Sequence, residues 1–339
     1  MMRSLTDSWE LGGVHVPNRV MLAPLAGIGN WFVRLQAKRY GAGMAVSEMV
    51  SSFGIHHGNE KTCTEMLRIH PEERRVGTDG SGGVTSLQLF GQDPDVMRSA
   101  AASVARVGGV DIIDLNMGCP VPKVMKTGAG AAMLKDPDTA VAVATAAREG
   151  SGLPVTVKLR SGERKGDRSG LDLAHRLVAE AGVAAITFHP RSAQVHHKGV
   201  PDYDLARELV ETLPAPVILT GGLQDVASIR SAFEYTGAEA VMLARGCLGN
   251  PWLFAQVLGL REEPPTRAEV LDELDWVMDR AVEHLGPDRG GRYLRKFYPW
   301  YVTTLGEGTA LQQALQQTST VEEARAVLAP LRDAAAAAA

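Results

Sequence analysis

The residue of this chain best suited to chemistry is a cysteine held in a stiff turn. Cys119 stands between Gly118 and Pro120. The apolar run before this turn stops at Asn116. Because glycine permits a turn and proline restricts it, we expect the thiol just past the carboxyl end of a strand, which is the functional side of a parallel α/β fold. Cys119 is therefore the candidate catalytic residue, and the alternative is an inert buried thiol.

Polar side chains also occur in three other apolar runs: Gln88 lies within 84–90, Lys158 lies within 155–159, and His189 ends 185–189. A lysine in a β-branched run is costly to bury unless it binds an anion. If these runs are parallel strands of one barrel, Lys158 and His189 reach the same pocket. The plainer interpretation of Lys158 is a side chain that extends to the surface.

Two clusters of small residues follow the last two apolar runs. They are Gly221-Gly222 and Ala244-Arg245-Gly246. Small residues expose backbone N–H groups to a phosphate, Arg245 adds a bidentate positive charge, and in a barrel these two loops are the usual phosphate site. Two ordinary tight turns are the alternative. No Gly-x-Gly-x-x-Gly run follows the first apolar run, so the pattern favours a mononucleotide such as FMN over a dinucleotide held in Rossmann style.

The ring of such a mononucleotide would have partners in the first and third runs. Pro24, Leu25 and Ala26 end the first run and could offer backbone atoms to an isoalloxazine ring. Gln88 could hydrogen-bond the pyrimidine edge of that ring.

Eight short apolar runs, each followed by a helical pattern, have to position these residues. They are 20–23, 44–47, 84–90, 112–115, 155–159, 185–189, 217–220 and 240–244. This alternation predicts a (β/α)8 TIM barrel, and a doubly wound sheet is the competing fold. A hairpin over 9–18, turning at Gly12-Gly13, could plug the bottom of the barrel. We expect the polar segment 51–83 to pass over the barrel mouth.

The pattern changes after Pro264-Pro265. Thr266 and Glu269 have the capping-box spacing, and the chain then shows helical signals with no strand signal. We therefore predict a catalytic barrel domain over 1–262 and a smaller all-helical domain over 266–333. Basic and aromatic residues meet near 289–301, which indicates either an RNA contact or a solvated helix face followed by core aromatics.

The whole chain limits the class of protein. Its three cysteines form no CxxC pair, and His56-His57 and His196-His197 are adjacent pairs that do not face one way, so we expect no metal site. No signal peptide or membrane-spanning run is recognisable, so we expect a cytoplasmic protein. The net charge of −4 means that nucleic-acid binding would need a local basic patch.

Several motifs together carry a resemblance to a known family. They are Pro24-Leu25-Ala26-Gly27, Ser47-Glu48-Met49-Val50-Ser51, Gln88, Asn116-Met117-Gly118-Cys119-Pro120, Lys158-Leu159-Arg160, His189-Pro190-Arg191, Gly221-Gly222 and Ala244-Arg245-Gly246. In this order they resemble the tRNA-dihydrouridine synthases, over about 20–254, with a weaker likeness in 295–301. The chain departs from the family pattern at Pro190, Ala193 and Thr220.

The resemblance implies an FMN-bearing barrel with a helical tRNA-binding domain, which reduces uridine to 5,6-dihydrouridine with NADPH. It implies that Cys119 donates the proton. The implied flavin contacts are Pro24, Leu25, Ala26, Gln88, Lys158, His189, Gly221, Gly222, Ala244 and Arg245. The expected substrate contacts are Asn116, Lys123, Arg191, Arg295 and Lys296, and a monomer is expected.

Two other functions stay open at this point. One is another FMN-barrel oxidoreductase, similar to the dihydroorotate or dihydropyrimidine dehydrogenases, which would have little use for a basic helical domain. The other is a non-catalytic RNA-binding protein on a barrel scaffold, because barrels host many functions.

Overall fold

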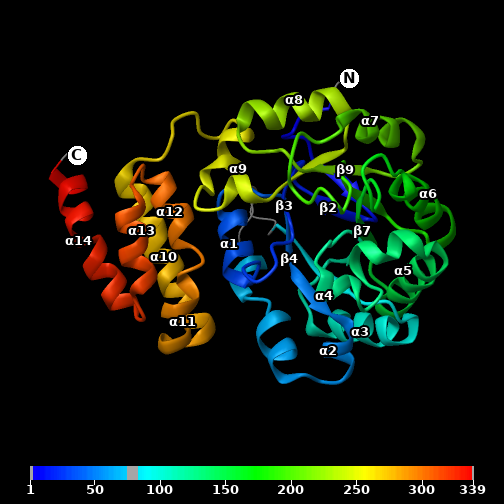
Figure 1. Ribbon diagram of the computed structural model, residues 1–339, viewed down its shortest axis with the longest axis horizontal. Helices are drawn as coiled ribbons and strands as arrows, with labels where there is room; N and C mark the ends of the chain where they lie inside the picture. Colours follow the sequence, from blue (N-terminus) through cyan, green and yellow to red (C-terminus); the bar gives the residue numbers. More distant parts are fainter. Residues whose placement is uncertain (1–2, 75–82, 338–339) are drawn as a thin grey trace. The chain divides into compact units, whose positions relative to one another are not determined.

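The computed structural model describes residues 3–74 and 83–337. The chain divides into two compact units, Met1–Ala244 and Arg245–Ala339, shown from blue to green and from yellow to red in Figure 1. The sequence-based domain limits, 1–262 and 266–333, stay a prediction.

Within the described residues of the first unit, eight parallel strands close into a barrel in the order β10-β3-β4-β5-β6-β7-β8-β9. The ring closes because Val241 of β10 pairs with Val20 on one side and with Leu219 on the other. The TIM-barrel prediction is thereby confirmed, and a doubly wound sheet is excluded. The strands of the barrel are β3 (Val20–Leu22), β4 (Met44–Ser51), β5 (Val84–Phe90), β6 (Ile112–Asn116), β7 (Val155–Arg160), β8 (Ala185–His189), β9 (Val217–Thr220) and β10 (Ala240–Leu243).

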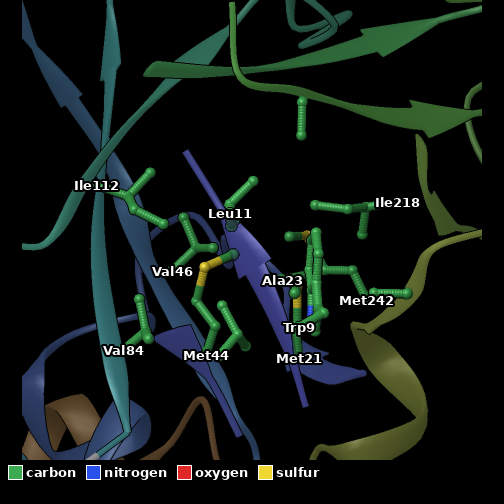
Figure 2. Close-up of a cluster of buried hydrophobic side chains, with 13 residues drawn as sticks. Trp9, Leu11, Met21, Ala23, Met44, Val46, Val84, Ile112, Ile218 and Met242 are labelled. Carbon is green, nitrogen blue, oxygen red and sulfur yellow. The ribbon is translucent and has the colours of Figure 1, made fainter. Parts of the chain in front are cut away.

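The amino-terminal end of the barrel is filled by a hairpin, as predicted. Strands β1 (Trp9–Leu11) and β2 (Val14–Val16) pair antiparallel. Trp9 and Leu11 pack in one buried cluster with side chains that begin the barrel strands, such as Met44 and Ile112 (Figure 2). Polar chemistry is therefore confined to the opposite, carboxyl-terminal end.

Helices surround the strands of the first unit (Figure 1). Several begin where the sequence supplies a cap: Asp93 accepts the N–H groups of Asp95 and Val96, and Asp136 accepts that of Thr139. The helices are α1 (Trp31–Arg39), α2 (Ser52–His56), α3 (Pro94–Val107), α4 (Pro122–Met125), α5 (Pro137–Ser151), α6 (Ser169–Ala181), α7 (Tyr203–Thr212) and α8 (Val226–Thr236).

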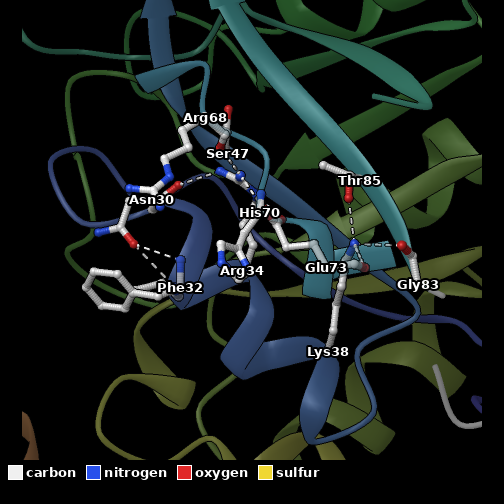
Figure 3. A network of polar contacts seen from close by, with 12 residues as sticks. Asn30, Phe32, Arg34, Lys38, Ser47, Arg68, His70, Glu73, Gly83 and Thr85 are labelled. Atoms are coloured by element: carbon white, nitrogen blue, oxygen red, sulfur yellow. Dashed lines mark hydrogen bonds and ion pairs between the residues drawn. The ribbon is translucent and has the colours of Figure 1, made fainter. Parts of the chain in front are cut away.

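The segment 51–83, which we expect to pass over the barrel mouth, contains one buried and paired carboxylate. Its residues 75–82 lie outside the described residues, and its turn Pro71–Arg74 packs against α1. Glu73 is fully buried, and both of its carboxylate oxygens accept from Arg34, at 2.8 and 2.9 Å. Lys38 donates to the Glu73 carbonyl at 3.1 Å (Figure 3). Glu73, which resembles part of a solvated loop in the sequence, is instead paired inside the molecule, while its neighbours Glu72 and Arg74 are exposed.

The second unit is helical throughout its regular elements, and its second helix begins at the predicted capping box of Thr266 and Glu269. Ion pairs join its first long helix to its last, for example Arg325 to Asp275 at 3.1 Å. Across the described residues, none of the helices combines the length and apolar character that a membrane crossing requires. The helices are α9 (Trp252–Val257), α10 (Arg267–Leu285), α11 (Pro287–Leu294), α12 (Tyr298–Thr304), α13 (Thr309–Gln317) and α14 (Val321–Ala337).

Candidate active site

The turn that carries Cys119 follows β6 and is held from both sides. Asn116 Oδ1 accepts the backbone N–H groups of Gly118 at 3.2 Å and Cys119 at 2.9 Å. Arg160 Nε donates to the Gly118 carbonyl at 2.9 Å, and the N–H of Ala131 donates to the Cys119 carbonyl at 3.0 Å. The Cys119 side chain is partly exposed. The thiol is thus accessible on a fixed backbone, which is what a proton donor requires.

A chain of hydrogen bonds runs from this turn into the barrel. Asn116 Nδ2 donates to Gln88 Oε1 at 2.9 Å, and Gln88 Nε2 donates to Asp114 Oδ2 at 2.6 Å. Thr156 Oγ1 donates to the other carboxylate oxygen of Asp114 at 2.6 Å. Burial raises the pKa of Asp114 to about 6, against the opposing effect of these two hydrogen bonds.

Asn116 was predicted to contact the substrate. Its carbonyl oxygen is occupied by the turn, and its amide also lies 3.7 Å from the sulfur of Met49, a weak acceptor. A substrate could displace only this weak contact without breaking the turn. The role of Asn116 in substrate binding stays a prediction.

Lys158 on β7 is a partly buried cation beside the turn. Its ammonium makes no hydrogen bond or ion pair within 3–74 and 83–337. Burial, and then Arg160, lowers the pKa of Lys158 to about 8, while Asp114 and Cys119 oppose this shift. A desolvated ammonium without a close partner favours an anionic or electron-rich ligand.

His189 ends β8 as a buried, neutral ring. An arginine has only donors, so His189 Nε2 must accept from Arg191 Nη1 across 3.1 Å, which leaves the ring proton on Nδ1. Burial, followed by Lys158 and Arg160, holds the pKa of His189 far below its usual value. Arg191 is itself buried and donates to the Gly199 carbonyl at 2.5 Å. In this geometry the predicted substrate residue Arg191 orients His189.

The loop after β9 has the shape of an anion cradle. Gly221 and Gly222 have φ values of +101° and +80°. A Cβ atom at Gly221 would lie 2.4 Å from the His189 ring, and one at Gly222 would lie 2.5 Å from the Tyr203 hydroxyl. Among the described residues, the N–H groups of Gly221 and Gly222 find no acceptor. Tyr203 fixes the loop by donating to the Gly221 carbonyl at 3.0 Å.

The loop after β3 presents its backbone at the same end of the barrel. Ala26 is exposed, Pro24 is partly exposed and Leu25 is buried. Glu48 holds this loop by accepting the N–H of Gly27 at 2.8 Å. In the sequence, Glu48 is recognisable only as part of the Ser47–Ser51 motif.

The site roles of the remaining predicted residues stay predictions. Lys123 is exposed on α4, and Ala244 is partly buried just after β10. The other three belong to the second unit: Arg245 is exposed, Arg295 donates to the Thr318 carbonyl and the Ser319 hydroxyl, and Lys296 lies 4.7 Å from the centre of the Tyr293 ring.

Two cavities open beside the site. One of about 280 Å³ lies between the Cys119 turn and the loops after β7 and β8, with Pro120 and Arg164 among its lining residues. The other, of about 470 Å³, is lined by Arg191, Lys165 and Lys198. Both walls carry acidic as well as basic side chains, with Glu163 in the first cavity and Asp167 and Asp202 in the second.

A buried functional-site residue that sequence reasoning missed is Asp114. A carboxylate within the apolar run 112–115 is itself a signal, because Asp is rarely buried without partners. Elsewhere in the described part of the chain, no three His, Cys, Asp or Glu side chains gather as the ligands of a metal would.

Comparison of the folded chain with solved structures returns barrels of the same kind. A 2-naphthoyl-CoA reductase complex superposes with a TM-score of 0.60 at 13% identity, over 78% of this chain and 53% of that one. Morphinone reductase superposes with a TM-score of 0.51 at 18% identity, over 78% and 92% of the two chains. Likeness at this identity supports the fold alone.

Comparison of sequences is more specific. The probable tRNA-dihydrouridine synthase of Mycobacterium tuberculosis (strain CDC 1551 / Oshkosh) is 34% identical over 324 residues, 93% of this chain and 82% of that protein. The tRNA-dihydrouridine synthase B of Pasteurella multocida (strain Pm70) is 31% identical, over 93% of this chain and 92% of that protein. The model of the family described as dihydrouridine synthase (Dus) matches residues 21–339. With this match and these relatives, the chain belongs to the dihydrouridine synthase family.

Proposed function

We propose that this protein reduces uridines of tRNA to 5,6-dihydrouridine, with FMN as cofactor, NADPH as reductant and Cys119 as proton donor. Membership of the family and the names of the relatives support the reaction class. The observation that carries the proposal is the accessible Cys119 thiol, held on a fixed turn at the barrel end where Lys158 and the glycine loop also lie.

The residues at this end fit a flavin mononucleotide. The unused N–H groups of Gly221 and Gly222 would hold its phosphate. The Lys158 ammonium and the Nδ1–H of His189 would face its electron-rich ring atoms, and Gln88 has one amide hydrogen left to donate. When bound, FMN supplies a hydride to C6 of the uracil ring.

Cys119 completes the reaction by transferring its thiol proton to C5. Negative charge develops on C5 and O4 during the reduction, so a nearby acid lowers the barrier. Lys158 is charged below a pH of about 8 and stabilises this charge electrostatically. Asn116 and Arg160 keep the Cys119 backbone in place while the proton moves.

The tRNA has to present a flipped base to this pocket, so it needs phosphate contacts around it. Lys123 and Lys126 are exposed close to the Cys119 turn in the sequence. In the second unit, the exposed residues Arg289, Arg292 and Lys296 follow a spacing of three and four, which places them along one face of α11 and its continuation. These cations supply the local basic patches that the net charge of −4 requires.

Replacement of Cys119 by alanine tests the proposal. The C119A protein should still bind FMN and oxidise NADPH, while dihydrouridine formation in tRNA falls by about 10²- to 10⁴-fold, the usual contribution of a positioned acid. Cys63 is exposed and outside the site, so C63A is the matched control and should keep full activity.

Dihydrouridine can be counted by mass spectrometry of digested tRNA. Unchanged turnover in C119A would remove Cys119 from the mechanism. Reduction of free pyrimidines in place of tRNA would favour another FMN-barrel oxidoreductase, and a colourless protein that binds no flavin would favour a non-catalytic RNA-binding role.

A further inference from the structure

In the series of hydrogen bonds behind the Cys119 turn, each donor points toward Asp114, and the carboxylate of Asp114 determines this direction. Thr156 and Gln88 both donate to Asp114, at 2.6 Å each. Asn116 then donates to Gln88, and the backbone of Cys119 donates to Asn116. Every bond in the chain therefore points toward the carboxylate of Asp114, which is buried inside the barrel.

A carboxylate is the one side chain here that cannot reverse this direction. The amides of Gln88 and Asn116 each have a donor end and an acceptor end, and either end could face a neutral partner. An ionised carboxylate only accepts, so Gln88 must turn its Nε2 toward Asp114 and its Oε1 toward Asn116. Asn116 must then turn its own carbonyl away from Gln88 and toward the backbone of the turn.

The register of three neighbouring strands brings Gln88, Asp114 and Thr156 together. Gln88 of β5 is paired with Asp114 of β6, and Asp114 is paired with Thr156 of β7. Asn116 lies two residues beyond Asp114, on the same face of β6 and one layer closer to the barrel mouth. The hydrogen bonds thus link the middle layer of side chains inside the barrel to the layer that holds the site.

We propose that Asp114 is a positioning residue for Cys119: by accepting from Gln88 it sets the orientation of both amides, and so directs the Asn116 carbonyl to the N–H groups of Gly118 and Cys119. The assignment of Cys119 as proton donor rests on the proposed function, whereas the orientation of the chain does not. The pKa of Asp114, raised to about 6, leaves the carboxyl ionised and acceptor-only at pH 7.5.

Three substitutions separate orientation from charge and from simple burial. Asp114→Ala removes the acceptor. Asp114→Asn removes the charge, yet its carbonyl can still accept from Gln88 while its amide donates to the Thr156 hydroxyl. Thr156→Val removes a neighbouring buried hydrogen bond but leaves the Gln88 contact intact, so it is the matched control.

Hydrogen–deuterium exchange of the Gly118 and Cys119 amides, read at single-residue resolution at pH 7.5, measures directly how well these two N–H groups are held by Asn116. In D114A we expect both amides to exchange about tenfold faster, which equals ~1.4 kcal/mol and is the size of one net hydrogen bond. D114N and T156V should each stay within about threefold of the wild type, since both keep an acceptor for Gln88. If D114A does not fold, Asp114→Leu keeps a branched side chain of similar shape without an acceptor and should reproduce the acceleration.

Wild-type exchange in D114A or D114L would overturn the proposal. So would equal acceleration in D114N and D114A, because charge and not orientation would then hold the turn. Neither tRNA nor NADPH enters the measurement, so a wild-type protein that fails to modify tRNA would contradict the proposed function and leave this result standing. As a second measurement, dihydrouridine formation should fall in D114A and should be close to the wild-type rate in D114N.

Discussion

Substitution of Gly221 by alanine tests where the cofactor phosphate binds. The φ of +101° is strained for any residue with a Cβ atom, at a cost of ~1–2 kcal/mol. The new Cβ would also lie 2.4 Å from the His189 ring, so either the ring or the loop has to move. Movement of the ring would break its hydrogen bond with Arg191, which adds ~1.5–3 kcal/mol for a bond to a charged group. We expect FMN affinity to fall about 10- to 100-fold.

Gly13→Ala is the control that separates the backbone strain in G221A from the steric clash with His189. Gly13 has a φ of +85°, and a Cβ atom there would meet nothing within 4 Å. It lies in the hairpin that plugs the opposite end of the barrel, so G13A should lose ~1–2 kcal/mol of stability and bind FMN as the wild type does. Fluorescence quenching of FMN gives the two dissociation constants, and urea unfolding gives the two stabilities. Should G221A bind FMN within about twofold of G13A, the glycine loop does not hold the phosphate.

Four further predictions concern charged side chains. Glu73→Gln leaves the guanidinium of Arg34 buried without its counter-charge, so urea unfolding should show a loss of ~3–5 kcal/mol in the first unit; a loss below ~1 kcal/mol would contradict a buried ion pair. FMN affinity should weaken as the pH rises from 7 to 9, because the Lys158 ammonium, with its pKa lowered to about 8, is charged below that pH and neutral above it; Lys158→Met should flatten this profile, and an unchanged slope would exclude Lys158 as the cause. Arg292→Ala should lower the slope of log affinity for tRNA against log salt by about 1 and leave unfolding unchanged. Arg295→Ala should instead destabilise the second unit, because its guanidinium holds the turn between α13 and α14.

The barrel could be predicted from the sequence because of how its strands are buried. Parallel strands covered on both faces appear as continuous apolar runs, and the runs predicted at 185–189 and 217–220 coincide with β8 and β9. The hairpin was recognisable for a different reason, from two short stretches with apolar residues on either side of a Gly-Gly turn. A residue that ends a parallel strand also has a known place at the carboxyl-terminal end. This is why Asn116 and His189 could be assigned to one region of the fold.

What the sequence could not supply is which neighbour each polar side chain meets. Glu73 lies in a stretch as charged as any exposed loop, and its burial depends on Arg34, which is 39 positions away. Pairing of this kind follows from packing between segments, and composition and periodicity carry no information about it. Local patterns therefore did not reveal the burial of Glu73.

The same limit applies to Asp114, with a greater consequence for the chemistry. The carboxylate is recognisably unusual in an apolar strand, but its meaning depends on the register of three strands. A slip of one residue in β6 would turn Asp114 out of the barrel and leave Gln88 to choose its own orientation. The register of β6 is specified by apolar packing at the amino-terminal end of the barrel, where Ile112 packs against the hairpin β1–β2. Placement of the Cys119 turn thus depends on the same hydrophobic packing that closes the opposite end of the fold.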